Sequence, residues 1–100
     1  MRVIAKSVLD RFAEQHPETR PSLERWHAVL RTAHWQSSHD VQRAAPKAKV
    51  LNVEWVRFEV AGGNYRMIVA FDFRRQIAFV KFIGSHADYD KIDALAVSQF

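Results

Sequence analysis

The sequence predicts an α+β fold, in which an antiparallel sheet carries two amino-terminal helices on one face and is followed by a short carboxy-terminal helix. Three observations support this prediction. Apolar and polar side chains alternate with a period of two across residues 53–83, apolar side chains recur at helical spacing within residues 8–34, and a helix-capping sequence begins at Ser85.

The predicted sheet contains three strands, and one of its faces is apolar. The side chains of this face alternate along the strands: Val56, Phe58, Val60, Met67, Val69, Phe71, Phe73, Ala78, Val80 and Phe82. Glycine and asparagine suit a hairpin turn, which requires positive φ. We therefore expect a two-residue turn at Gly63-Asn64, which pairs Phe58 with Val69.

The third predicted strand follows a turn at Arg74-Arg75. This turn sets Phe82 beside Met67, so Phe82 is expected on the apolar face. Lys81 and Ile83 are then expected on the opposite face, because neighbouring residues of a strand point to opposite sides.

The opposite face combines cations with large apolar side chains. Arg57, Arg66 and Lys81 alternate onto it, and Ile68 and Phe79 lie between them. One interpretation is an outer face exposed only to solvent. Such a surface seldom carries so many large apolar residues among its charges, so the pattern favours a binding surface.

The composition favours a single globular domain spanning residues 1–100 with an anionic partner. Hydrophobic residues make up 48% of the chain and charged residues 26%. The net charge of +4 and the pI of about 9.9 favour a negatively charged partner. The absence of cysteine excludes disulfides and thiolate metal sites. No apolar signal core and no span of ~18 apolar residues is present, so we expect a cytoplasmic protein without membrane contact.

Two helices are predicted before the sheet. Ser7 is the expected N-cap of the first, with Asp10 in the reciprocal capping position, and Pro17 ends this helix. The second begins between residues 19 and 22, where Pro21 suits the first turn because the N–H that proline lacks would have no partner there. Both helices carry an apolar stripe and should pack on the apolar face of the sheet.

Two further segments complete the predicted organisation. Residues 2–5 are a candidate strand that could extend the sheet. Residues 36–52 are expected to form a loop, with a helical turn within residues 38–45 before Pro46. Lys49 in this loop could contact a phosphate backbone, although a solvated side chain is the simpler interpretation.

His27 and His34 lie along the apolar side of the second predicted helix. They are too far apart for the adjacent-turn pair of a helical metal site, and no cysteine or third histidine has a matching spacing. We therefore expect structural histidines, no metal site and no cofactor.

The third strand leads directly into a polar cluster. Ser85 and Asp88 have the spacing of a capping box, which places His86 in the first turn of a short helix. Tyr89 and Asp90 then lie on the same side as His86, since residues three and four apart are neighbours on a helix. The cluster could simply hold this turn, or it could transfer protons, because a neutral imidazole can accept one.

The turn Gly63-Asn64-Tyr65-Arg66 and the later run Ser85-His86-Ala87-Asp88-Tyr89-Asp90 together resemble motifs of the HigB family of bacterial toxins in toxin–antitoxin systems. The family patterns are a Gly-Asn-x-Tyr-Arg turn and a Thr-His-x-x-Tyr-Asp ending. The turn here is one residue shorter, and Ser85 replaces threonine. The resemblance implies a RelE-like fold and an mRNA endonuclease that acts mostly on ribosome-bound transcripts. It also implies inhibition by a HigA-type antitoxin with a helix-turn-helix domain.

The resemblance and the chemistry of RNA cleavage together suggest roles for individual side chains. Cleavage without a metal ion needs a base for the 2′-hydroxyl, cations for the charge on phosphorus and an acid for the departing 5′-oxygen. The predicted catalytic residues are Arg66, Lys81, His86 and Tyr89. The residues predicted to bind the substrate or to orient these groups are Arg57, Asn64, Lys49, Phe79 and Asp90.

Within the catalytic set, Arg66 and Lys81 would stabilise the phosphorane. His86 would act as acid or base, and Tyr89 would stack on a base or donate its hydroxyl proton. Lys81 could replace His86 as the base if neighbouring Arg66 destabilises its charged form.

Two other functions stay open at this point. A non-catalytic RNA- or protein-binding module would bind in a salt-sensitive way without cleaving RNA. A toxin of the same fold could instead act on DNA gyrase, which would arrest growth while messenger RNA stays intact.

Overall fold

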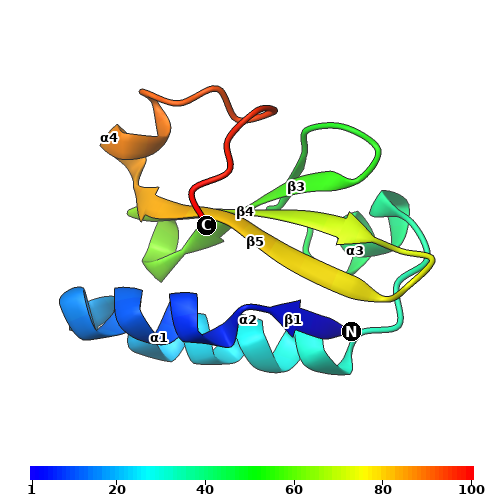
Figure 1. Ribbon diagram of the computed structural model, residues 1–100, viewed down its shortest axis with the longest axis horizontal. Helices are drawn as coiled ribbons and strands as arrows, with labels where there is room; N and C mark the ends of the chain where they lie inside the picture. Colours follow the sequence, from blue (N-terminus) through cyan, green and yellow to red (C-terminus); the bar gives the residue numbers. More distant parts are fainter.

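The structure is a five-stranded sheet with helices on both of its faces. The elements of the computed structural model, which describes residues 1–100, are β1 (Arg2–Ile4), α1 (Lys6–Gln15), η1 (Pro17–Thr19), α2 (Arg20–Thr32), α3 (Ser38–Ala44), β2 (Lys49–Val50), β3 (Trp55–Val60), η2 (Ala61–Gly63), β4 (Tyr65–Asp72), β5 (Ile77–Ser85) and α4 (His86–Tyr89). The strand order is β1-β5-β4-β3-β2, and only β1 and β5 are parallel. Helices α1 and α2 cover one face of the sheet, and α4 stands on the other (Figure 1). The predicted α+β class is confirmed, with a mixed rather than a purely antiparallel sheet.

The two amino-terminal helices pack against the sheet. Pro21 lies in the first turn of α2, as predicted. The predicted N-cap of α1 is wrong, because this helix begins at Lys6, directly after Ala5, and no side chain caps it. Since β1 pairs with β5 as far as Ile4, a single residue separates the strand from the helix, and Ser7 already lies in the first turn.

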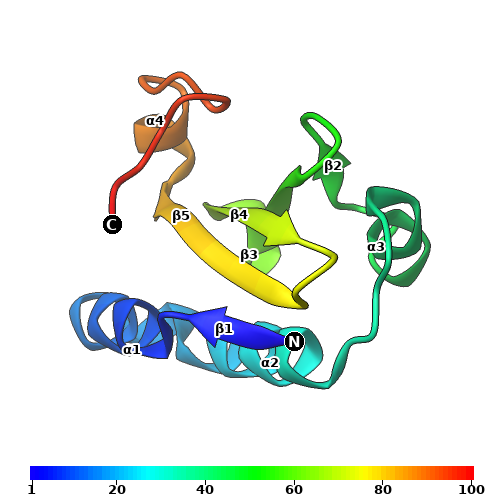
Figure 2. The same cartoon turned by 45° about the vertical axis from the view of Figure 1, so that its right-hand side comes forward.

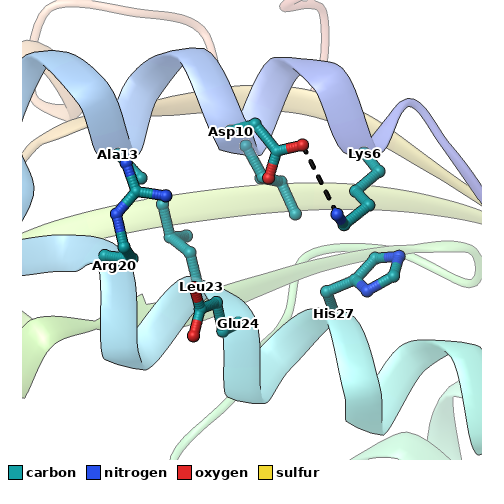
Figure 3. A pocket seen from close by; sticks show the side chains of 8 residues that line it. Lys6, Asp10, Ala13, Arg20, Leu23, Glu24 and His27 are labelled. Carbon is teal, nitrogen blue, oxygen red and sulfur yellow. Dashed lines mark ion pairs between the residues drawn. The ribbon is translucent and has the colours of Figure 1, made fainter.

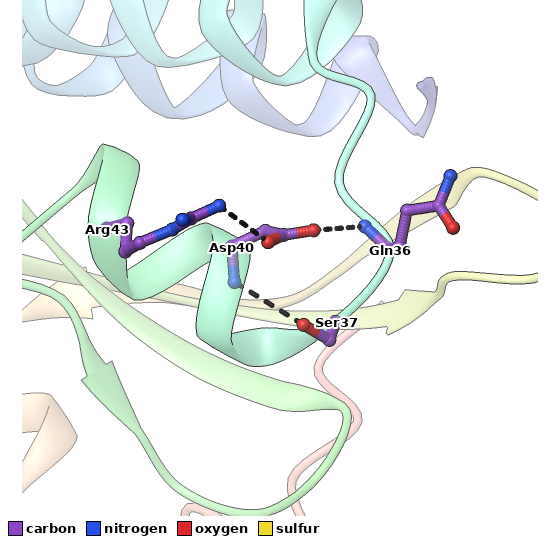
Figure 4. Close-up of polar contacts among 4 residues, drawn as sticks. All are labelled: Gln36, Ser37, Asp40 and Arg43. Carbon is purple, nitrogen blue, oxygen red and sulfur yellow. Dashed lines mark hydrogen bonds and ion pairs between the residues drawn. The ribbon is translucent and has the colours of Figure 1, made fainter.

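A capped helix orders the segment between α2 and the sheet. The Ser37 hydroxyl accepts a hydrogen bond from the Asp40 N–H at 3.4 Å, and the Asp40 carboxylate accepts one from the Gln36 N–H at 2.9 Å (Figure 4). Arg43 pairs with the same carboxylate at 3.1 Å. The predicted helical turn is confirmed as α3, which lies beside the β2 edge of the sheet (Figure 2). The loop prediction is wrong at β2, whose two residues are too few to show alternation.

The register of β3 and β4 differs from the predicted one by two residues. Phe58 lies opposite Met67 and not opposite Val69, because the chain turns through η2 and not through a two-residue turn. Ala61 and the two glycines that follow it have φ angles of 52°, 69° and 90°. A slip of two residues keeps every side chain on its predicted face, since the side-chain period of a strand is two.

A β-bulge interrupts the pairing of β4 with β5. Val69 lies opposite Val80, whereas Ile68 lies opposite Phe82. Lys81 is therefore an extra residue with no partner in β4.

Because of this bulge, Phe82 and Ile83 each lie on the face opposite the predicted one. The prediction that Phe82 lies beside Met67 on the apolar face is wrong. Ile83 lies opposite Met67 and belongs to the core under the helices, whereas Phe82 lies on the other face with Ile68. Because of the extra residue at the bulge, every later side chain in β5 points to the face opposite the one predicted.

The main core lies between the sheet and helices α1 and α2. Leu23 from α2 packs there with Phe58 and Met67 from the sheet, and all three are buried. Burial of side chains of this size stabilises the fold by roughly 1.5–3 kcal/mol each. The indole N–H of Trp26 donates a hydrogen bond to the backbone carbonyl of Glu59 at 3.0 Å, which ties α2 to β3. Helices α1 and α2 thus occupy one face, and α4 stands on the other (Figure 1).

Candidate functional site

The cationic face is the side of the sheet opposite α1 and α2, and its cations are Lys49, Arg57, Arg66 and Lys81. Lys49 lies opposite Arg57 in the neighbouring strand, so β2 brings both side chains to the same face. None of the ion pairs in the structure includes these four cations. Even Glu59, which lies opposite Arg66, makes no ion pair with it. The cationic face therefore has uncompensated positive charge, which favours an anionic ligand.

Tyr89 of α4 lies against two of these cations. Its ring centroid is 5.5 Å from the guanidinium carbon of Arg57 and 5.5 Å from that of Arg66. Such cation–π contacts stabilise by about 0.5–1 kcal/mol at exposed sites. The Nε atoms of both arginines are buried and have no acceptor in the protein. The fold thus brings together two guanidinium groups without carboxylate partners and one phenol.

Phe82 supports this tyrosine from the sheet. The ring centroids of Phe82 and Tyr89 are 6.3 Å apart, with an angle of 52° between the rings. At Gly84, an added Cβ would lie 2.7 Å from the end of the Phe82 ring and 3.3 Å from the Cβ of Asp88. The missing side chain of Gly84 therefore lets the strand end, the Phe82 ring and α4 approach one another closely. Phe82 was predicted on the apolar face and not at this site, because the alternation of side chains does not reveal the bulge.

Lys81 is the bulged residue, and it is half-buried. Its ammonium nitrogen lies 5.5 Å from the ring centroid of Phe79. Bulges often redirect a side chain next to a functional site. Here the bulge puts Lys81 and Phe82 on the cationic face although they are consecutive in the sequence.

A capping box fixes the start of α4. The Ser85 hydroxyl accepts a hydrogen bond from the Asp88 N–H at 3.1 Å, and the Asp88 carboxylate accepts one from the Ser85 N–H at 3.3 Å. The His86 N–H donates to the backbone carbonyl of Asn64 at 3.1 Å. Asn64 thus holds the start of α4 against the turn that follows β3.

His86 and Asp90 form a polar pair beside this turn. The Nδ1 atom of His86 lies 3.2 Å from an Asp90 carboxylate oxygen, and the two side chains are 53% and 60% exposed. When Nδ1 donates a proton to this carboxylate, Nε2 of the neutral imidazole is free to accept one. The pair can therefore orient the imidazole for proton transfer with an external hydroxyl.

Tyr65 belongs to the turn motif but faces the helices. Its hydroxyl donates a hydrogen bond to the Glu18 carboxylate and lies 3.5 Å from Nδ1 of His16, and its ring packs edge-on against Phe12. The hydrogen bond is the largest cause that raises the pKa of Tyr65 and lowers the pKa of Glu18. Tyr65 therefore fastens the start of β4 to the end of α1 and to η1.

His27 lies between α1 and α2, away from the cationic face (Figure 3). It lines a cavity of about 80 Å³ together with Lys6 and Asp10, which pair at 3.5 Å. Partial burial lowers the pKa of His27, and the charges of Lys6 and Arg31 act in the same direction. His34 is exposed beyond the end of α2.

The structure offers neither a metal site nor a membrane-spanning helix. No group of three or more His, Cys, Asp and Glu side chains is arranged to hold a metal ion. None of the helices has both the length and the apolar character needed to cross a membrane.

The mixed sheet, the two helices on one face and the cationic face on the other define a RelE-like protein. A family model described as HigB_toxin, RelE-like toxic component of a toxin-antitoxin system, matches residues 19–92. The chain therefore belongs to the HigB toxin family, and as a toxin of such a system it has an antitoxin as its partner. It is 28% identical over 95 residues to the mRNA interferase HigB of Escherichia coli O6:H1, an alignment that covers 92% of this chain and 91% of that protein. All of the predicted site residues lie within the span that the family model matches.

Proposed function

We propose that this chain is a metal-independent mRNA endonuclease, an mRNA interferase that cleaves ribosome-bound transcripts in the cytoplasm. The main support for this proposal is the contact of the Tyr89 ring with Arg57 and Arg66. It lies on a face where no carboxylate pairs with the cations. The His86–Asp90 pair adds a group that can move a proton. The similar protein named mRNA interferase HigB supports the same activity.

The proposed reaction is attack by a ribose 2′-hydroxyl on the adjacent phosphorus. His86 takes the hydroxyl proton at Nε2, while Arg66 and Lys81 stabilise the additional negative charge on the phosphorane. The bond from phosphorus to the 5′-oxygen then breaks, and Tyr89 donates its hydroxyl proton to the departing oxygen. The products are a 2′,3′-cyclic phosphate and a free 5′-hydroxyl. Lys81 is the alternative base.

The remaining residues of the proposed site bind the RNA or orient the catalytic groups. Arg57 and Lys49 bind phosphates on one side of the reacting one, because β3 and β2 follow β4 in the strand order, and the two side chains lie opposite each other in these neighbouring strands. Phe79 offers a ring for base stacking, which is worth about 1–3 kcal/mol per base. Asn64 and Asp90 position His86, and both can also contact the substrate.

We further propose that the antitoxin is a HigA-type protein with a helix-turn-helix domain. An acidic segment of this partner would be complementary in charge to the cationic face. The ribosome would present the messenger RNA to the same face.

Controlled expression in bacteria tests this proposal. Growth and transcript 5′ ends are followed over minutes for the parent, Arg66→Ala, His86→Ala and the control Arg43→Ala, whose arginine already pairs with Asp40 in α3. The parent and the control should produce new 5′ ends within translated messages, and the site variants should reduce cleavage by roughly 100- to 10,000-fold. Folded site variants that cleave at the parent rate would refute these assignments.

The same experiment separates the alternatives. Growth arrest without new 5′ ends would point to DNA gyrase or another target. A folded protein that neither arrests growth nor cleaves, but binds RNA in a salt-sensitive way, would be a binding module.

A further inference from the structure

The carboxy-terminal segment, which lies outside residues 19–92 that the family model matches, covers the free edge of β5. β1 pairs with β5 only from Ile77 to Phe79, so the later part of this edge has no strand beside it. The carboxy-terminal segment returns from α4 to this edge (Figures 1 and 2). Gln99 lies there, outside residues 19–92 that the family model matches.

Gln99 makes two hydrogen bonds that lie on either side of Phe82. Its backbone N–H donates to the backbone carbonyl of Lys81 at 2.9 Å. Its side-chain oxygen accepts from the backbone N–H of Ile83, also at 2.9 Å. One residue thus holds the backbone of the bulge from the side that β4 does not reach.

The position of these bonds matters because Lys81 has no partner in β4. A bulged residue disrupts the strand ladder locally, and its backbone is free to move unless another group holds it. We propose that Gln99 is a positioning residue that closes the bulge and so keeps the ammonium group of Lys81 directed at the cationic face. The effect on cleavage rests on the proposed function, whereas the effect on the bulge does not.

Substitutions at Gln99 can separate positioning from general stability. Gln99 is exposed and is not part of the core, so the isosteric change Gln99→Met should leave the fold intact while removing the acceptor for the Ile83 N–H. Gln99→Glu keeps an acceptor oxygen at the same distance along the side chain and should retain the parent behaviour. Ser98→Ala is the matched control, because the Ser98 hydroxyl bonds only to Phe100 within the same segment.

The first measurement is amide hydrogen exchange at Ile83, which does not depend on activity. Gln99→Met should exchange about 3- to 10-fold faster than the parent, as expected for the loss of one hydrogen bond. Gln99→Glu and Ser98→Ala should exchange at the parent rate. Unchanged exchange at Ile83 in Gln99→Met would overturn the proposal.

The second measurement is steady-state cleavage of ribosome-bound messenger RNA in a double-mutant cycle with Lys81→Met. Gln99→Met should lower kcat by about tenfold with little change in KM, and it should add nothing in the Lys81→Met background, because it acts through that side chain. Equal loss in both backgrounds, or no loss while Lys81→Met is impaired, would overturn the proposal and leave the proposed function standing. A parent that does not cleave RNA would refute the proposed function, and the Ile83 exchange would then decide the role of Gln99 in the bulge.

Discussion

The Tyr89 ring lies 5.5 Å from the guanidinium carbon of Arg66, and this contact joins α4 to the cationic face. Its geometry depends on the capping box at Ser85, which sets the direction of α4, and on Gly84, which lets α4 approach the strand end. A phosphate that binds Arg66 would therefore bind next to a phenol.

Replacement of Tyr89 should separate the role of the ring from that of the hydroxyl. Tyr89→Phe keeps the ring on Arg57 and Arg66, so stability and RNA affinity should stay at the parent level. The cleavage rate should fall by about 100-fold or more, because the proposed proton donor is lost. Single-turnover cleavage and RNA titrations measure the two effects. A Tyr89→Phe protein that cleaves at the parent rate would limit Tyr89 to stacking.

Replacement of Arg57 should weaken RNA binding in a salt-dependent way. Arg57 has no carboxylate partner, so Arg57→Ala removes the proposed phosphate contact and the cation–π contact with Tyr89 without breaking an ion pair. For single-stranded RNA, the plot of the logarithm of the binding constant against the logarithm of the salt concentration has a negative slope. In Arg57→Ala this slope should become less steep by about 0.7. Arg43→Ala, which removes a paired arginine, should leave the slope unchanged. Equal slopes for the parent and Arg57→Ala would place Arg57 outside the RNA contact.

The facing of most side chains was predictable from the sequence, whereas their register was not. A period of two places Arg57 and Arg66 on one face whatever the turn, so the slip of two residues at η2 did not alter the face. The register itself depends on Ala61, a non-glycine residue at positive φ, which composition does not reveal.

The bulge and the long-range contacts were not predictable for a different reason. Alternation through Val80, Lys81 and Phe82 is the same with or without an extra residue, so nothing in the pattern marks the bulge. The contacts of Tyr89 with two arginines and of Gln99 with β5 depend on where α4 directs the chain. Local patterns do not contain that information.

Loss of the Tyr65 hydroxyl should destabilise the fold within a defined pH range. Because the pKa of Glu18 is lowered on folding, its contribution is present above the ordinary value of 4.5 and is lost as pH falls below it. Because the pKa of Tyr65 is raised, its contribution is present below 10.0 and is lost as pH rises above it. Tyr65→Phe should therefore lower the urea midpoint at neutral pH, and the difference should shrink in acid and in strong base. A difference that is constant across this range would exclude the hydrogen bond to Glu18 as its cause.

Replacement of His27 should reduce the pH dependence of stability in weak acid. Partial burial between α1 and α2, with Lys6 and Arg31 nearby, lowers the pKa of His27 below its ordinary value of 6.5. The unfolded chain then binds more protons than the folded one, so this contribution is fully present above 6.5 and is lost as pH falls. Urea unfolding of the parent and of His27→Gln between pH ~5 and ~8 measures it. The free energy of unfolding should fall less steeply with acidification in His27→Gln than in the parent. Identical pH profiles for the parent and His27→Gln would show that the imidazole between the two helices protonates equally well in the folded and unfolded chain.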